Sequence, residues 1–529
     1  MSEARLAGHP LRLGPRRWST IWGTLPGVAL AMLHSSVLDL PRTDFIDALH
    51  ADRYRIYWII GSYLVGAATG MASTSLFASR HGLRRAYLGA LAVFTVASTS
   101  CVFASTVEGM VLPRLVSGYA MGLMISSAML LLWREFADDR ELAMTLYGMG
   151  VYLSSLVGAV IGGLLLFEFP WRTIFALDLP LGLAAWLASR RLLPEDAHAG
   201  HTVPDGSGAR LAEHARFDLF GFAVFAIWVV SMVVVLAFGQ WWGWFDSPSF
   251  VPWFVICAVS FLSFVAWGLA SPAPLIDLRP LGERNFGLGL TLKALFSIDF
   301  FVVLSLLSGY MIDLRGYQWW QGGAVLLCGA ATMLAAMLAS ARFGRDETRK
   351  LRMFLGMALM AAMTWRISAV DLYTSKLWLA GALAIWGVGA GAAIGPIMLT
   401  TFAGVPPSTL LRAAGVFNIF RSLPVFAVGS MLLVFFTWQT DGHFDRLRLR
   451  ITYNRPLVEE TLQRTARHAT ERGSPIGVDA KRAHAVLTGW VHRNARAFAL
   501  EDVLRVLSLL TATSLLLIPL LRPPPAENV

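Results

Sequence analysis

The sequence predicts an all-α polytopic membrane protein, and two observations carry that prediction. The first is composition: of 529 residues, 56% are hydrophobic and 15% are charged, with a mean hydropathy of +0.58. Soluble domains carry about 25% charged residues. The second is distribution, because the apolar residues form about fourteen runs long enough for a helix to cross a bilayer.

The predicted spans follow one another with short polar turns between most of them. An even number of spans places both termini on one side of the membrane. The fourteen runs lie near 20–40, 54–78, 86–106, 109–133, 142–167, 172–189, 217–241, 250–270, 287–312, 319–341, 351–370, 377–402, 412–439 and 499–521.

Clusters of basic residues give the orientation of the spans. Arginines gather in the N-terminal arm, in the turn after the second run and in the turn after the tenth run, all on one side. Cytoplasmic loops carry an excess of Lys and Arg, so both termini are expected in the cytoplasm of a multi-pass bacterial inner-membrane protein. The net charge of +10 therefore reflects topology, and we expect no nucleic-acid partner.

Polar segments divide the chain into seven regions. The segment before the last span is rich in Arg, His and Glu, with helix-like stretches at 455–472 and 478–498. It is either a solvated cap or a docking surface for a partner protein. The regions are a cytoplasmic arm (1–19), an N-terminal six-helix half (20–189), a cytoplasmic linker (190–216), a two-helix insert (217–270), five helices of a C-terminal half (271–439), a periplasmic cap (440–498), and the last helix with a cytoplasmic tail (499–529).

No pattern of enzyme chemistry is present in the sequence. Cys101, Cys257 and Cys328 fall in three separate apolar runs, which predicts neither a disulfide framework nor a metal site. There is no nucleophile elbow, phosphate loop or metal-spaced His/Cys cluster, so we expect no enzyme activity and no bound cofactor. The first apolar run lacks a small-residue cleavage site and is expected to remain as a span.

The fifth run carries small residues at every fourth position. Gly150, Ser154, Gly158 and Gly162 share one helix face, and Gly163 widens it. Without Cβ bulk, a neighbouring helix can approach to backbone contact. This strip is either a static helix contact or a conformational hinge between moving parts.

Several motifs resemble those of one transporter family. Residues 158–163 read G-A-V-I-G-G and resemble the G-P-x-x-G-G element in the fifth helix of major facilitator antiporters. Residues 171–182 resemble the W-R-x-I-F-x-I-N-x-P-x-G that opens the sixth helix of the fourteen-helix drug/proton antiporters of the EmrB and QacA type. Further matches, closest to the EmrB type, are Trp58, Ser62 and Tyr63 (W-x-x-x-S-Y), Arg114 and Gly118 (R-x-x-x-G), Arg284–Phe286 (R-N-F) and Asn418–Arg421 (N-x-F-R).

The chain departs from the family pattern at five positions, one of which is Ser117, in place of the usual glutamine of the fourth helix. His34 stands where the family has an aspartate taken as the proton carrier, and Ala159 replaces the proline of the fifth helix. Asp178 replaces an asparagine. In the cytoplasmic turn, Ser79 replaces the acid that latches the two halves, while the family's basic and glycine positions are kept as Arg80, Gly82, Arg84 and Arg85.

The resemblance implies a fold of two six-helix halves that rock about a central site, with a two-helix insert between them. It implies proton-driven export of hydrophobic or amphipathic toxic compounds, with the proton gradient as energy source. A periplasmic adaptor and an outer-membrane channel would complete a tripartite pump, with the adaptor docking on the cap. The alternatives are an exporter of one dedicated metabolite or lipid without proton coupling, and a non-transporting scaffold or sensor.

Ionisable residues inside spans are functional candidates, since a charge at bilayer depth is costly. For proton coupling the candidates are His34, Asp39, Asp299 and, through the family's proton-transfer arginine, Arg114. His34 could instead be a neutral core histidine, and Asp39 could lie at the interface. We expect Arg114 to need a carboxylate or carbonyl partner, and we expect Asp299 or His34 to pair with it or with a neighbour.

The substrate pathway is expected to include Trp58, Tyr63, Lys293, Asn418 and Arg421. Arg421 could meet an anionic substrate group or brace the C-terminal half. Lys293 lies near a span end, so its amine could instead snorkel to the interface. Asp178 is interpreted as a helix-start residue near the outer end.

Overall fold

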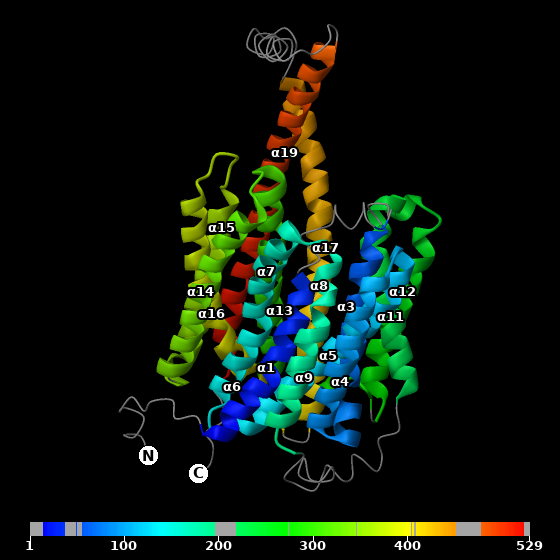
Figure 1. The fold of residues 1–529 in the computed structure, drawn as a ribbon, viewed down its shortest axis with the longest axis vertical. Coiled ribbons are helices and arrows are strands. Elements are labelled where there is room, and N and C mark those ends of the chain that lie inside the picture. Colours follow the sequence, from blue (N-terminus) through cyan, green and yellow to red (C-terminus); the bar gives the residue numbers. More distant parts are fainter. Residues whose placement is uncertain are drawn as a thin grey trace.

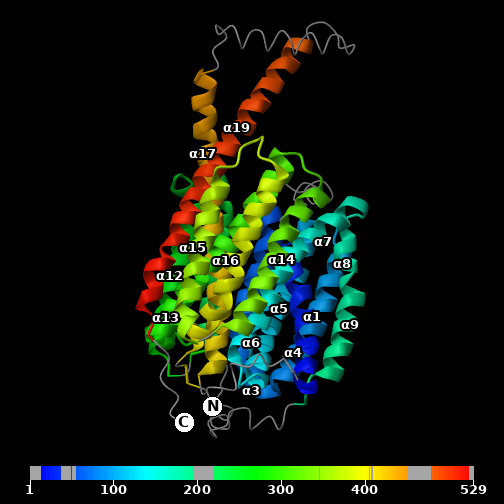
Figure 2. The same ribbon diagram turned by 90° about the vertical axis from the view of Figure 1, so that its left-hand side faces the viewer.

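The computed structural model describes residues 14–36, 49, 55–195, 218–272, 274–344, 346–403, 405–406, 409–450 and 478–522. All regular structure in these residues is helical. The helices run roughly along one axis and form a single bundle (Figures 1 and 2). This confirms the predicted all-α fold class.

The N-terminal half contains six passes within the described residues. The fifth pass is one continuous helical segment with a π-helical turn in it, and the sixth begins with a short helix. The passes are α1 (Pro15–Ser36), α3 (Ile56–His81), α4 (Leu83–Ser100), α5 (Val107–Glu135), α6 (Arg140–Gly148) with η4 (Met149–Leu153) and α7 (Ser154–Glu168), and α8 (Arg172–Ala176) with α9 (Asp178–Leu192).

The insert and the C-terminal half follow. The insert is α11 (Leu219–Trp242) and α12 (Phe250–Ala270), which pack together beside α3 (Figure 1). The C-terminal half consists of α13 (Arg284–Gly309) with η7 (Tyr310–Leu314), α14 (Trp319–Phe343), α15 (Arg349–Ser368), α16 (Lys376–Phe402), α17 (Leu410–Arg450) and α19 (Val478–Ala512), which ends in α20 (Ser514–Leu517) and η9 (Ile518–Leu520).

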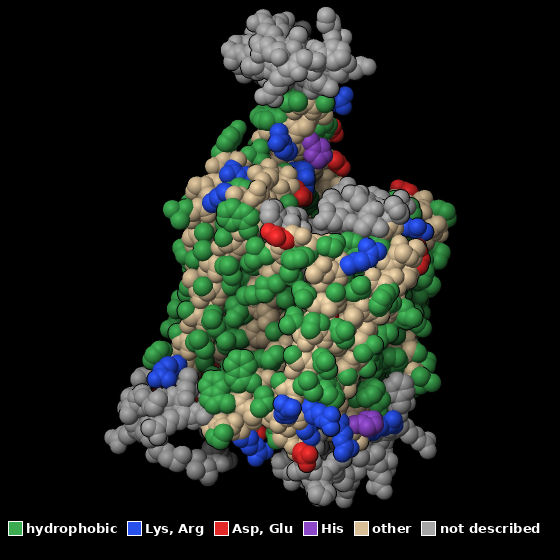
Figure 3. All heavy atoms as spheres, in the orientation of Figure 1, with side chains coloured by type: hydrophobic (Ala, Val, Ile, Leu, Met, Phe, Trp, Pro, Cys, Tyr) green, Lys and Arg blue, Asp and Glu red, His purple; other side chains and the backbone are tan. Residues whose placement is uncertain are grey.

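The outer surface of the bundle matches a membrane environment. Eleven helical segments in the described part of the chain are long and apolar enough to cross a bilayer. On the face seen in Figure 3, apolar side chains form a broad belt, and Lys and Arg side chains lie at the two rims of that belt. The chain is therefore a multi-pass membrane protein.

Very close helix contacts involve glycines of α3 and α5, of which only Gly118 was part of a motif noted in the sequence. In α3 and α5, a Cβ atom added at Gly66, Gly70, Gly118 or Gly122 would collide with the backbone of the partner helix. A similar contact occurs in the C-terminal half, where Gly387 of α16 packs on the backbone of α14. Small residues allow this backbone approach in membrane helices. The two halves thus repeat the same tight contact between their second and fourth passes.

The predicted glycine strip of the fifth pass is rearranged. Residues Met149–Leu153 form a π-helical turn, which inserts an extra residue and breaks the four-residue periodicity. As a result Gly150 faces Leu25 and Val28 of α1, within its own half. Gly158 and Gly162 are buried in α7, and Gly163 lies in α7 beside them. Gly148 of this pass, by contrast, faces the other half, next to Met337 of α14.

The region before the last span also differs from its predicted boundaries. Helix α17 continues to Arg450, and α19 begins at Val478 and runs into the last span (Figures 1 and 2). Both helices extend beyond the rest of the bundle at one end. Asp502 of α19 accepts hydrogen bonds from Gln439 (2.9 Å) and contacts His443 (2.8 Å), which joins the two helices at their base. The predicted helix at 455–472 lies outside the described residues.

The opposite end is where α1 begins and η9 finishes, and we call it the terminal end. The carbonyl of Leu521 accepts a hydrogen bond from Lys350 at the start of α15 (2.6 Å). The backbone N–H of Arg522 donates to Asn285 at the start of α13 (2.9 Å). The first and last described segments therefore lie on the same side of the bundle, as the even number of spans predicts.

Candidate functional site

Asn418 joins the two halves at the centre of the bundle. Its amide oxygen accepts a hydrogen bond from the Tyr147 hydroxyl of α6 (2.6 Å), and its amide nitrogen donates to Ser126 of α5 (3.3 Å). All three side chains are buried. Because Asn418 lies on α17 of the C-terminal half, these bonds cross the interface between the halves.

Arg421, one turn further along α17, also reaches across this interface. Its Nη1 lies 3.8 Å from the sulfur of Met32 in α1. It interacts electrostatically with Tyr147 and Tyr152. Tyr152 in turn shares a 2.8 Å hydrogen bond with Ser297 of α13. The structure thus brings together residues of α1, α6, η4, α13 and α17, which we call the central site.

Lys293 belongs to the same region, and the snorkelling alternative is wrong for it. The side chain is 0% exposed, and its Nζ donates to the backbone carbonyl of Phe417 (2.9 Å). Helix α13 is packed against α17 at this level, so the amine has no path to the membrane surface. Lys293 and Arg421 are close enough to repel each other electrostatically.

Arg114 is buried in the N-terminal half, but its direct partner is not the carboxylate or carbonyl we expected. Its guanidinium lies over the ring of Tyr63, 4.0 Å from the ring centroid. The Tyr63 hydroxyl donates to the carbonyl of Ala31 (3.0 Å), which fixes the ring against α1. Among the described residues, Nε and Nη1 of Arg114 have no hydrogen-bond partner. The cation is held by the aromatic ring, with Asp178 within electrostatic range.

His34 pairs with Asp178, a contact between residues 144 positions apart in the chain. The His34 Nε2 lies 2.7 Å from one carboxylate oxygen, and the Ser98 hydroxyl donates to the other (2.5 Å). Asp178 does begin α9, as interpreted from the sequence, but it is 1% exposed and lies inside the half. The sequence reading did not pair these residues, since nothing in either local motif points to the other.

Asp299 lies at the core of the C-terminal half with a different set of partners. The carboxylate is 0% exposed and accepts hydrogen bonds from the hydroxyls of Thr364 and Thr511 and from the indole N–H of Trp386, each at 3.0 Å. No described cation forms an ion pair with it. The hypothesis that Asp299 pairs with Arg114 is therefore wrong, because the donors come from α15, α16 and α19 of its own half.

One other predicted site residue, Trp58, does not lie in the central site. Trp58 is 37% exposed, and its ring packs on Phe238 of the insert at 5.0 Å between centroids. It lies on the flank of the N-terminal half that faces α11. Asp39 lies outside the described residues.

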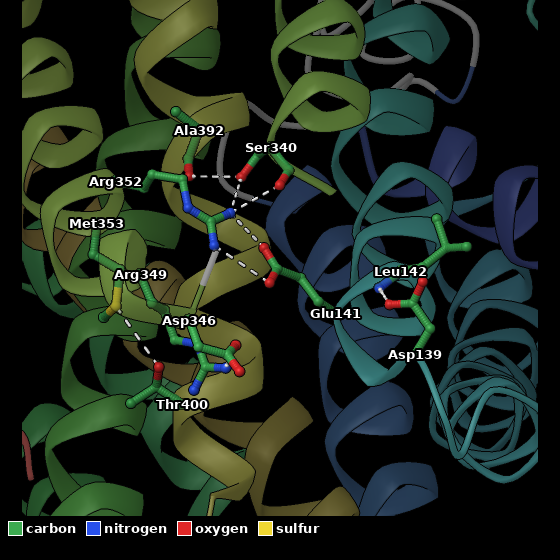
Figure 4. A network of polar contacts seen from close by, with 10 residues as sticks. All are labelled: Asp139, Glu141, Leu142, Ser340, Asp346, Arg349, Arg352, Met353, Ala392 and Thr400. Atoms are coloured by element: carbon green, nitrogen blue, oxygen red, sulfur yellow. Dashed lines mark hydrogen bonds and ion pairs between the residues drawn. The ribbon is translucent and has the colours of Figure 1, made fainter. Parts of the chain in front are cut away.

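An ion pair joins the halves at the terminal end of the bundle. Arg352, at the start of α15, forms an ion pair with Glu141 in the first turn of α6 (Figure 4). The same guanidinium donates to the carbonyl (2.9 Å) and hydroxyl (2.8 Å) of Ser340 in α14. Both charged side chains are largely buried. The sequence reading missed this contact because Glu141 and Arg352 are separate surface-like charges in the sequence.

The turn that carries Arg80, Gly82, Arg84 and Arg85 makes its contacts inside the N-terminal half. Gly82 adopts a φ of +85°, which a residue with a side chain rarely takes, and so permits the sharp change from α3 to α4. Arg84 donates to the carbonyl of Arg190 at the end of α9 (2.7 Å) and lies 3.6 Å from Glu195. These Arg84 contacts brace α4 against the end of α9, while Glu141 and Arg352 connect the halves.

No cluster of three or more metal-binding side chains occurs among the residues that the structure describes. What the described interior offers is a set of buried charges and hydroxyls between two helical halves. Such groups are costly at bilayer depth and mark the paths of substrates and ions in transporters. This arrangement suits binding and gating.

Comparison with known proteins agrees with the fold. A family model described as Major Facilitator Superfamily matches residues 18–429. The chain is 24% identical over 373 residues to the multidrug export protein EmrB of Escherichia coli (strain K12), covering 69% of this chain and 70% of that protein. It is 25% identical over 406 residues to the tetracenomycin C resistance and export protein of Streptomyces glaucescens, covering 76% and 72%. It is 22% identical over 501 residues to the colistin resistance protein EmrB of Acinetobacter baumannii, covering 93% and 94%.

Proposed function

The chain belongs to the major facilitator superfamily of transporters, and from that premise we propose that it exports hydrophobic or amphipathic toxic compounds by proton antiport. The observation that carries this proposal is the central site, where Asn418 and Arg421 of one half meet Tyr147 and Met32 of the other. A site built from both halves changes shape when the halves rock, as alternating access requires. Relatives named for multidrug export and for tetracenomycin C resistance support the substrate class.

The proposed mechanism assigns the gate to the ion pair between Glu141 and Arg352. With this pair formed, the two halves are held together at the terminal end. Opening that end must separate the charges, so substrate entry from this side requires the pair to break. Two charges held in a low-dielectric interface give a bistable contact of the kind that a transport cycle needs.

Protons are proposed to act at two buried carboxylates. Asp299 can take up a proton without breaking an ion pair among the described residues, because its partners are neutral hydroxyl and indole donors. His34 and Asp178 can share or lose a proton at their 2.7 Å contact. Arg114 lies over the ring of Tyr63 and interacts electrostatically with Asp178.

The orientation follows the distribution of basic residues. We place the terminal end in the cytoplasm of a bacterium and the extended ends of α17 and α19 in the periplasm. The cap formed around these ends is the proposed docking surface for a periplasmic adaptor that leads to an outer-membrane channel. Such a path would carry substrates past both membranes.

The proposal is tested with the purified protein in liposomes under an imposed pH gradient. Addition of candidate hydrophobic toxins is expected to release protons, and His34→Ala or Asp299→Asn is expected to abolish the release. Substrate movement without proton flux would contradict antiport. If both variants keep full efflux and its pH dependence, the proton sites are assigned wrongly.

A second candidate is export of one dedicated metabolite or lipid without proton coupling. The presence of His34 in place of the family's aspartate favours it. A resistance screen separates the two: protection against many unrelated compounds supports multidrug export, and protection against a single compound supports the dedicated exporter.

A further inference from the structure

Two buried basic side chains approach the same stretch of α17 in the central site. Lys293 of α13 bonds to the carbonyl of Phe417, and Arg421 lies one helical turn further along α17. Residues four apart share a helix face, so the amine and the guanidinium approach the same stretch of α17. Both side chains are almost fully buried, and they repel each other.

No described carboxylate pairs with either cation. Asp299 lies on the same helix as Lys293 but is held by Thr364, Thr511 and Trp386. Asp178 is held by His34 and Ser98 inside the N-terminal half. Nη1 of Arg421 lies 3.8 Å from the sulfur of Met32, and its Nε has no hydrogen-bond partner among the described residues.

An uncompensated pair of like charges is costly in a membrane protein. Each buried cation has lost its hydration, and each raises the cost of the other. Lys293 donates to the carbonyl of Phe417 and its Nζ also lies over the Phe417 ring, 2.9 Å from the ring centroid, which together leave part of its three-donor capacity unused. The guanidinium of Arg421 has five donors. The described residues therefore leave donors and positive charge that a negatively charged ligand would satisfy.

The surroundings of the two cations are apolar and polarisable. Met32 contacts Arg421, and Tyr147 and Tyr152 lie within its electrostatic range. Tyr152 packs against Phe296, Phe300 and Phe301 of α13. Methionine and aromatic side chains adapt to varied apolar shapes, whereas the charge fixes where the head group lies.

We infer that Arg421 and Lys293 bind the head group of an amphipathic anion, a carboxylate or sulfonate, whose apolar body lies against Met32, Tyr147 and Tyr152. Arg421 supplies a planar pair of N–H donors that match two carboxylate oxygens, and Lys293 supplies a point charge beside them. The same anion would bring Arg421 of one half closer to the tyrosines of the other. This inference rests on the proposed export function and narrows its substrates to anions.

Three naphthalene probes of similar size and different charge test the inference. They are 2-naphthoate (anionic), 2-naphthamide (neutral) and 2-naphthylmethylammonium (cationic). Binding is measured with the full-length protein in nanodiscs of zwitterionic lipid, with empty nanodiscs subtracted, so that anionic lipid headgroups do not compete. We expect 2-naphthoate to bind about tenfold tighter than either other probe, since charge-assisted hydrogen bonds are the stronger kind.

Substitutions of Arg421 test whether this residue causes the preference for the anionic probe. Arg421→Gln is expected to weaken 2-naphthoate binding about tenfold and to leave 2-naphthamide binding unchanged. Arg421→Lys keeps the charge and should keep most of the preference. Arg366→Gln is the matched control, because it removes an exposed arginine from α15 and the same unit of charge. The control should bind all three probes as the wild type does.

The outcomes separate this inference from the proposed function. Equal or tighter binding of the neutral or cationic probe by the wild type overturns the inference, and so does an unchanged preference in Arg421→Gln. If Arg421→Gln fails to fold, the inference is judged from the order of the three probe affinities in the wild type and from the loss of anion preference in a Lys293→Gln variant. The same probes are also tested for transport in proteoliposomes. If the neutral or cationic probe is transported and the anion is not preferred, the inference is wrong but the export function stands. If the anion binds and no probe is transported, the export function is contradicted but the anion site stands.

Discussion

Each half of the protein has an almost fully buried carboxylate in its core, and the two carboxylates are stabilised in different ways. In the N-terminal half, Asp178 contacts the ring of His34 and the hydroxyl of Ser98, with Arg114 within electrostatic range. In the C-terminal half, Asp299 accepts hydrogen bonds from two threonines and a tryptophan, and no described cation pairs with it. One carboxylate lies near other ionisable groups, and the other is surrounded by neutral donors.

This difference indicates different roles for two otherwise similar halves. Removing the charge at Asp178 leaves a buried arginine without compensation and a histidine without its acceptor. Removing the charge at Asp299 leaves neutral donors that a neutral amide or acid can still satisfy. The account therefore gives Asp178 a structural role in addition to its place, with His34, on the proposed proton path. It assigns the uptake and release of the coupled proton in the C-terminal half to Asp299.

The largest expected effect is that of Asp178→Ala. The substitution removes the acceptor of two buried hydrogen bonds and leaves Arg114 uncompensated, and stranded buried charges cost about 3–5 kcal/mol. We expect a large fall in the thermal unfolding temperature of the purified protein and loss of transport. Asp246→Ala, at an exposed acid in the insert, is the matched control. If Asp178→Ala unfolds close to the wild-type temperature, Asp178 does not have the structural role assigned to it.

Asp299→Asn should change stability much less than Asp178→Ala. The amide oxygen can still accept from Thr364 and Trp386, so we expect a loss of about 1 kcal/mol. Transport should nevertheless lose its dependence on the pH gradient, because the asparagine cannot bind a proton. Thr364→Val keeps the carboxylate and serves as the control. A pH-dependent Asp299→Asn transporter would exclude this residue as the coupling site.

The gate between the halves should respond to charge reversal. Glu141→Arg or Arg352→Glu alone places like charges together, so each is expected to reduce transport severalfold and to weaken the closed terminal end. The double swap restores opposite charges, and the coupling between the two substitutions should be roughly 1–2 kcal/mol in a double-mutant cycle. Additive effects of the two single substitutions would show that the ion pair does not link the halves.

The smallest expected effect on stability is that of Asp138→Asn, in the exposed turn between α5 and α6. The Arg17 guanidinium donates to the Asp138 carboxylate and holds its pKa below the usual range. A lowered pKa in the folded state contributes stability above the unfolded pKa, and that stability is lost as the pH falls through the folded pKa. The small stability difference between wild type and Asp138→Asn should therefore be constant from about pH 5 to 8 and shrink below about pH 4. The measurement is the unfolding temperature of both proteins as a function of pH. A stability difference between wild type and Asp138→Asn that grows on acidification would contradict the prediction.

The sequence predicted the fold well because its signals are local. Apolar runs report membrane spans directly, and motifs such as Asn418–Arg421 carry the family resemblance within a few residues. Helix ends were less predictable, since α17 continues to Arg450 through polar residues that Asp502 of α19 helps to hold. The π-helical turn at Met149 was also hidden, because a four-residue glycine spacing presumes a regular helix.

The pairing of site residues could not be predicted from the sequence. His34 and Asp178 belong to the first and sixth passes, and Glu141 and Arg352 belong to different halves. Each contact depends on how the helices pack, and local motifs do not contain that information. The sequence did single out His34, Arg114, Lys293, Asp299 and Arg421 as costly inside a membrane, and the structure places all five in the buried interior.

The most direct test of the contrast between the two carboxylates is proton release from the purified protein in unbuffered solution when a transported substrate is added. The account predicts release by the wild type and by Thr364→Val, and none by Asp299→Asn. Release by Asp299→Asn equal to that of the wild type would contradict the assignment of the coupled proton to the C-terminal half.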